Sequence, residues 1–182
     1  MKTKILIFML FAFAQLASAQ KQIAKTGHIW FYSYTPIEVI EAHNHQVVSI
    51  LDESTGDIVI NLLIKSFEFK VALMQEHFNE NYMESTKFPK STFKGKITNL
   101  NNIDFKKDGT YSTEITGDIT IHGVTKPITT TGTITISNGQ LSANAKFKVL
   151  PKDFGIEIPK LVEEKIAKEI EITVDIPYSS AK

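Results

Sequence analysis

The stretch Gly117-Asp118-Ile119-Thr120-Ile121-His122-Gly123-Val124-Thr125-Lys126-Pro127-Ile128 predicts a strand, a tight polar turn and the start of a second strand. Ile119 and Ile121 alternate with polar residues, which is the period-two pattern of a strand with one buried face. A turn this short joins two strands that run antiparallel. The stretch therefore indicates an antiparallel sheet.

The same alternation recurs along the chain, between further turn signals. Apolar residues occupy every second position from Ile58 to Ile64 and from Ile170 to Ile176. Asp-Gly at 108–109 and Asn-Gly at 138–139 supply the positive φ angles that two-residue turns need. The patterns predict strands at residues 28–35, 45–52, 57–68, 91–99, 111–121, 128–137, 140–149 and 169–177. This number of strands closes a sheet without free edges. The predicted fold is therefore all-β: an eight-stranded antiparallel lipocalin-like barrel.

Two segments break the strand pattern. In residues 71–83 the apolar side chains fall on one stripe of a helix, opposite polar ones: Val71, Met74, Phe78 and Tyr82. Residues 159–168 predict a second short helix. We expect the apolar face of the first helix to pack over one end of the barrel.

The first 19 residues have the features of a signal peptide. Lys2 and Lys4 form a basic start, an apolar run follows at 5–14, and Ala17-Ser18-Ala19 offers the small residues that a signal peptidase recognises. The run is shorter than the about 20 residues that span a bilayer. We therefore expect cleavage after Ala19, one barrel domain at residues 20–182, and a periplasmic or secreted protein with no transmembrane anchor in the mature chain.

Composition narrows the classes of partner. The chain of 182 residues has 20 basic residues, 20 acidic residues and no cysteine. Loss of Lys2 and Lys4 leaves a formal charge of −2 and about 160 residues, enough for one domain with a real core. A near-neutral chain without a basic run has no electrostatic reason to bind nucleic acid, so no such partner is expected. The sequence leaves a homodimer open.

Three segments resemble the YceI-like family of bacterial envelope proteins, and they occur in the family's order. They are Leu73-Met74 through Phe88-Pro89 to Phe93, then Ile119 to Ile128, and then Phe147-Lys148-Val149 with Asp153-Phe154-Gly155-Ile156. The resemblance covers roughly residues 28–177. It implies an antiparallel barrel that holds a long apolar lipid, of the polyisoprenoid or isoprenoid-quinone type, in its interior.

A site for a hydrocarbon tail needs an apolar lining and little else, because burial contributes about 25 cal/mol per Å² of apolar surface. Candidates come from the predicted strands and the helical stripe. They are Phe67, Phe69, Met74, Phe78, Tyr82, Phe93, Ile97, Ile119, Ile121, Phe147, Ile172 and Val174. Ordinary core packing is the alternative for each of them. The expected function is that of a carrier that holds an isoprenoid or other long-chain amphiphilic lipid by burial, without catalysis.

The histidines are the residues at which metal binding or catalysis is conceivable. His43 and His45 lie on one face of an extended strand and can supply two metal ligands. A third would come from elsewhere in the chain: His28, His77 or His122. Because the pair itself lacks a third and fourth ligand and no helical His-Glu-x-x-His pattern occurs, we expect no metal and no cofactor. The structural interpretation is that His43 and Asn44 satisfy backbone groups where the chain bends and that His122 hydrogen-bonds across the turn ending at Pro127.

No catalytic nucleophile is predicted, since no serine lies in a Gly-x-Ser-x-Gly elbow and cysteine is absent. Two alternatives to the carrier stay open. One is an envelope metal-dependent hydrolase that uses His43, His45 and His122. The other is a fully packed barrel whose loops bind another protein.

Overall fold

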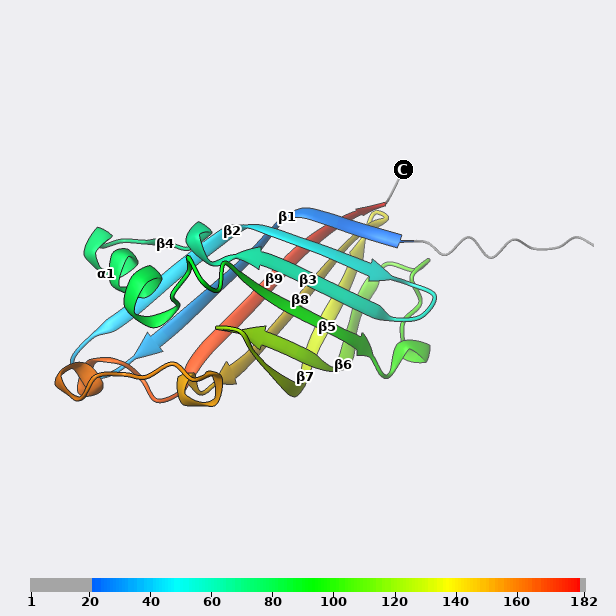
Figure 1. Ribbon diagram of the computed structural model, residues 1–182. Coiled ribbons are helices and arrows are strands. Elements are labelled where there is room, and N and C mark those ends of the chain that lie inside the picture. Colours follow the sequence, from blue (N-terminus) through cyan, green and yellow to red (C-terminus); the bar gives the residue numbers. More distant parts are fainter. Residues whose placement is uncertain (1–20, 181–182) are drawn as a thin grey trace, which may run out of the picture.

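The computed structural model describes residues 21–180, and these form a barrel with one covered end (Figure 1). The strands are β1 (Lys21–Tyr34), β2 (Val39–Asp52), β3 (Asp57–Leu63), β4 (Glu68–Phe69), β5 (Lys90–Ile97), β6 (Gly109–Ile121), β7 (Val124–Ser137), β8 (Gln140–Val149) and β9 (Ile170–Ser180). The helical pieces are η1 (Ile64–Ser66), α1 (Ala72–His77), the π-helical turn η2 (Phe78–Tyr82), η3 (Leu100–Asn102), η4 (Pro151–Phe154) and η5 (Lys160–Lys165). The predicted signal peptide and its cleavage site lie outside the described residues.

The sheet closes on itself through antiparallel pairing. The strand order is β1-β9-β8-β7-β6-β5-β3-β2, and β2 pairs with β1 to close the barrel. The short β4 also pairs with β2. Closure removes the free edges on which other strands add. The predicted eight-stranded antiparallel barrel is confirmed.

The hairpin at His122 and Gly123 has the tight turn that its sequence predicts. Both residues have positive φ angles, 50° and 74°, as a two-residue turn with the right twist requires. β7 begins directly after this turn, earlier than the predicted start at residue 128. Pro127 is tolerated there because β7 pairs with β8 only from Gly132 onward, so the missing N–H interrupts no ladder on that side.

Other boundaries also differ from the sequence-based prediction. β1 and β2 begin well before residues 28 and 45, because the two strands pair with each other through these segments, which include Gly27 and Asn44. The strand predicted at 57–68 ends at Leu63, where η1 turns the chain toward the covered end. The predicted helix at 71–83 forms α1 and η2, whereas residues 159–168 form only the short 3₁₀ helix η5.

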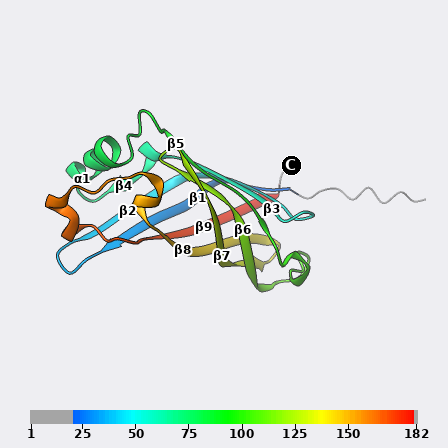
Figure 2. The same ribbon diagram turned by 60° about the horizontal axis from the view of Figure 1, so that its bottom comes forward.

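The two ends of the barrel differ in how they are filled. The end at which β1 begins and β9 ends is packed by aliphatic side chains, and Leu51, Ile97 and Ile134 are at most 1% exposed there. A void of about 80 Å³ remains between them. At the opposite end, α1 and the segment between β8 and β9 lie across the mouth (Figures 1 and 2). Within residues 21–180 no helix is long and apolar enough to cross a membrane.

Candidate functional site

The covered half of the barrel is hollow. Its cavity has a volume of about 480 Å³, and most of the side chains that line it are aliphatic or aromatic. Cavities that hold small molecules have volumes in this range and a similar predominance of apolar lining. The alternative of a fully packed interior is therefore wrong for this half of the barrel.

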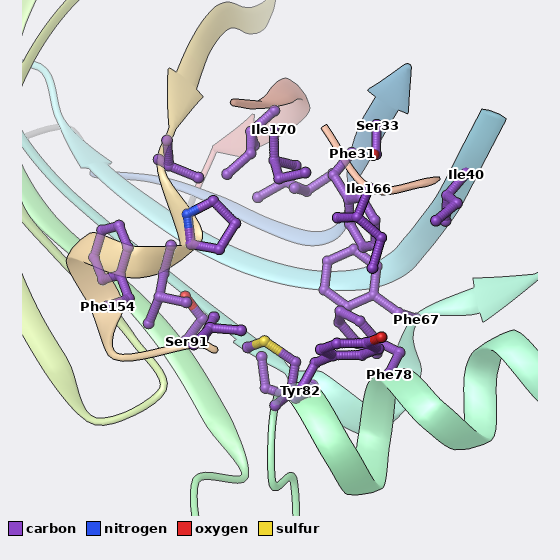
Figure 3. Close-up of a pocket in the computed structure, with 18 of the residues that line it drawn as sticks. Phe31, Ser33, Ile40, Phe67, Phe78, Tyr82, Ser91, Phe154, Ile166 and Ile170 are labelled. Carbon is purple, nitrogen blue, oxygen red and sulfur yellow. The ribbon is translucent and has the colours of Figure 1, made fainter. Parts of the chain in front are cut away.

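Four phenylalanine rings form one wall of the cavity. Figure 3 shows three of them, Phe31, Phe67 and Phe78, close together. Phe31 from β1 stacks on Phe78 from η2 with 5.4 Å between ring centroids. Phe67 and Phe69 lie 5.6 Å and 5.0 Å from the Phe78 ring, in tilted or edge-on arrangements. Such pairs are each worth about 0.5–1.5 kcal/mol beyond the area they bury. This wall is a preformed aromatic surface, held by segments from three parts of the chain.

The floor of the cavity depends on a pair of glycines. Gly95 of β5 lies opposite Gly117 of β6, and the Phe93 ring covers both of them. A Cβ atom on Gly117 would lie 2.4 Å from the Gly95 Cα and 2.8 Å from the Phe93 ring. The absence of side chains at both positions therefore lets this ring lie flat against the inner face of the sheet.

Nearly all residues predicted to contact a lipid line this cavity. The structure places these in its wall: Phe67, Phe69, Met74, Phe78, Tyr82, Phe93, Ile119, Ile121, Phe147, Ile172 and Val174. Ile97 does not line it, because it belongs to the packed end. Burial raises the pKa of the Tyr82 hydroxyl, as expected for a phenol at an apolar wall.

Sequence reasoning missed several residues of the lining, with Phe31 the most consequential. Phe31 stands between Trp30 and Tyr32, so three successive aromatic residues hide which of them faces inward. Others come from the segment before β9, which lacks a regular period: Ile156, Ile158, Val162 and Ile166. Only the fold shows that this segment covers the mouth.

Polar groups in the lining gather at the mouth. Glu38, in the turn between β1 and β2, faces Lys165 of η5 at 4.0 Å, and the exposed His77 of α1 also borders the cavity. The buried Ser33 Oγ accepts the Ala167 N–H at 2.9 Å, which ties the covering segment to β1. The cavity thus has an apolar interior and a mixed polar rim.

His122 fastens the cover on the other side of the mouth. One ring nitrogen donates to the Phe154 carbonyl oxygen at 3.1 Å, and the other faces the Glu84 carboxylate at 2.9 Å. The Phe88 ring packs edge-on against the imidazole with 4.5 Å between centroids. The predicted bond across the turn itself is wrong, because the ring points away from β7 toward η4 and η2.

His28, His43 and His45 lie outside the cavity. His43 and His45 share the outer face of β2, as predicted, and their partner is His28 of β1. The proposed triad of His43, His45 and His122 is therefore wrong. Between the pair, the fully buried Asn44 donates from Nδ2 to the Leu63 carbonyl oxygen, which confirms its predicted role toward the backbone. The same prediction is wrong for His43, whose ring nitrogens face the side chains of His28 and Glu41. Burial first, and then the neighbouring His45 and His43, lower the pKa of His28.

Fold and cavity together define a closed antiparallel barrel with an internal apolar binding site. A family model of the YceI-like domain matches residues 17–178. The chain therefore belongs to the YceI-like family, and the resemblance seen in its sequence is confirmed. The comparison with curated proteins gave no match.

Solved structures with the same fold have distant sequences. A polyisoprenoid-binding domain from Saccharophagus degradans superposes with a TM-score of 0.77 at 11% identity, over 90% of this chain and 99% of that one. BcnA of Burkholderia cenocepacia gives a TM-score of 0.70 at 13% identity, over 84% and 96% of the two chains. The YceI protein of Campylobacter jejuni gives 0.56 at 15% identity, over 100% and 99%. At these identities the similarity establishes the fold.

Proposed function

We propose that this protein is a carrier that holds an amphiphilic lipid of the isoprenoid type inside its barrel and acts by burial without catalysis. The observation that carries the proposal is the cavity of about 480 Å³ with its aromatic wall. A flexible hydrocarbon chain gains free energy from every apolar surface it covers, so the cavity needs no directional contact with the tail. The polyisoprenoid-binding neighbour from Saccharophagus degradans supports this class of ligand.

The orientation of the lipid follows from the distribution of polar groups. Its tail would lie against the aromatic wall and above Phe93, whereas its headgroup would stay at the rim near Glu38, His77 and Lys165. A buried headgroup without partners would cost several kcal/mol, and the interior offers few hydrogen-bonding groups. Export to the periplasm or beyond is part of the proposal and rests on the signal-peptide features of residues 1–19.

The experiment uses protein produced with its signal peptide and purified from the cell envelope. Native mass spectrometry followed by organic extraction should detect a co-purifying lipid at up to one molecule per chain. Ile172→Trp places a larger ring in the cavity and should abolish the bound species, while Thr173→Trp, whose side chain points outward from the next position of β9, should keep it. A wild-type protein that carries no lipid and binds no fluorescent isoprenoid analogue would refute the proposal.

A further inference from the structure

Three imidazole rings gather on the outer face of the barrel where β1 pairs with β2. His28 comes from β1, and His43 and His45 come from β2; one nitrogen of each lies within 4.8 Å of the other two. His28 Nε2 and His43 Nδ1 are 3.0 Å apart. The His28 ring stacks on the His45 ring with 4.1 Å between centroids and on the Trp30 ring with 4.5 Å. The side chains are therefore collected into one compact group.

An irregularity in strand pairing produces this arrangement. Gly27 pairs with Val47 and Ile29 with Asn44, so a single residue of β1, His28, faces two residues of β2. The extra residue of this bulge lies on β2, and the His28 side chain lies opposite it, stacked on the His45 ring and 3.0 Å from His43 Nδ1. Ile29 points into the cavity, which leaves the neighbouring His28 on the opposite, outer face of β1.

The surroundings of the three rings are those of a ligand set. The Glu41 carboxylate lies 3.3 Å from His43 Nε2, so it can accept the proton on that nitrogen and leave Nδ1 with a free lone pair. Carboxylates that hold metal-binding histidines in this way fix both the tautomer and the ring orientation. Asp175 of β9 lies opposite His28 of β1 and adds a second negative charge beside the three histidines.

We propose that His28, His43 and His45 bind a divalent transition-metal ion of the zinc, copper or nickel class. Imidazole nitrogen suits these three metals, and three histidines with water in the fourth position form a complete tetrahedral set. Two nitrogens bonded to one tetrahedral zinc ion are separated by about 3.3 Å, given bonds of about 2.0–2.1 Å. The 3.0 Å between His28 Nε2 and His43 Nδ1 is already close to that spacing.

The site is separate from the proposed lipid site, because the wall of the barrel lies between them. A metal ion here would contact neither the cavity nor a lipid inside it, so the two activities can fail independently. The position on the outer face also allows substitutions that leave the core unchanged. His77, an exposed histidine on α1 outside the group, provides the matched control.

The test is calorimetric titration of mature protein without a histidine tag with ZnCl₂, CuCl₂ and NiCl₂. We expect one equivalent of each metal to bind. Glu41→Gln should weaken binding by about 10–100-fold, the usual effect of removing a supporting carboxylate. His28→Asn, His43→Asn and His45→Asn should each weaken it more, whereas His77→Asn should leave it unchanged. Melting temperatures without metal identify any variant that fails to fold.

An independent measurement needs no variant. Electron paramagnetic resonance of the wild-type protein with one equivalent of Cu²⁺ should show hyperfine coupling to several imidazole nitrogens. The proposal is overturned if wild-type protein binds Zn²⁺ no better than a variant in which His28, His43 and His45 are all replaced by asparagine. It is also overturned if His77→Asn weakens binding as much as each of the three single variants does. A Cu²⁺ spectrum with one coupled nitrogen would also overturn it. Ile172→Trp should leave the metal affinity unchanged whether or not it blocks lipid binding.

Discussion

Replacement of Phe78 by alanine separates a lining residue from a core residue. The ring contributes to three aromatic pairs, yet it is only partly buried and one side borders the cavity. A lipid tail that lies on this wall would lose the contact of one aromatic side chain, which corresponds to about 1–3 kcal/mol. The dissociation constant of a fluorescent isoprenoid analogue should therefore rise by about 5- to 150-fold.

The loss of stability should come mainly from the three aromatic pairs of Phe78 and should be smaller than that of a fully packed core phenylalanine. Phenylalanine-to-alanine changes in a packed core cost about 3–5 kcal/mol, largely because they create a cavity, but here the cavity already exists. Leu51→Ala at the packed end is the matched control: it should lower the free energy of unfolding by about 2–5 kcal/mol and leave the affinity of the folded protein unchanged. Urea denaturation and ligand titration on all three proteins give both quantities. The reasoning is refuted if wild-type protein shows no saturable binding while Phe78→Ala is destabilised as strongly as Leu51→Ala.

Three other expectations follow from single residues. Burial raises the pKa of Tyr178 to about 12. The stabilisation from the neutral phenol, about 2–3 kcal/mol, is therefore fully present below about pH 10 and is lost as the pH rises toward 12. Urea denaturation of wild type and Tyr178→Phe between about pH 9 and about pH 11.5 checks this. Gly117→Ala should lower stability by about 1–3 kcal/mol through its clash with Gly95, measured by thermal melts. Exported protein should begin at Gln20; intact-mass measurement that finds Met1 would contradict the predicted cleavage.

The barrel could be predicted because its signals are local. Period-two alternation and glycine-containing turns specify strands and their antiparallel connections without reference to the rest of the chain. The signal fails where local pattern does not determine the outcome. The residues before 28 and 45 lack strict alternation and include Gly27 and Asn44, yet β1 and β2 extend through them because the two strands pair with each other there.

The site could be predicted only in part, for a related reason. Side chains on regular strands and on the helical stripe were assigned correctly to the interior, from Phe93 to Val174. Whether Phe31 faces inward depends on the alternation of side chains along β1. Three adjacent aromatic residues conceal that alternation in the sequence. The position of His28 beside His43 and His45 depends on strand pairing and on a bulge in β2 opposite His28, and such a bulge leaves no distinct sequence pattern.

The segments that carry the family resemblance meet at the cover of the cavity. Phe88 packs on His122, His122 bonds to the Phe154 carbonyl oxygen, and Phe154 is buried where β7 has separated from β8. Hydrogen bonds and a two-residue turn are directional, so particular residues are needed at these positions. Contact with a hydrocarbon chain is not directional, and many combinations of large apolar side chains serve equally well. The family is therefore recognisable from how the barrel is closed, while the identity of the proposed lipid depends on a wall that sequence motifs do not describe.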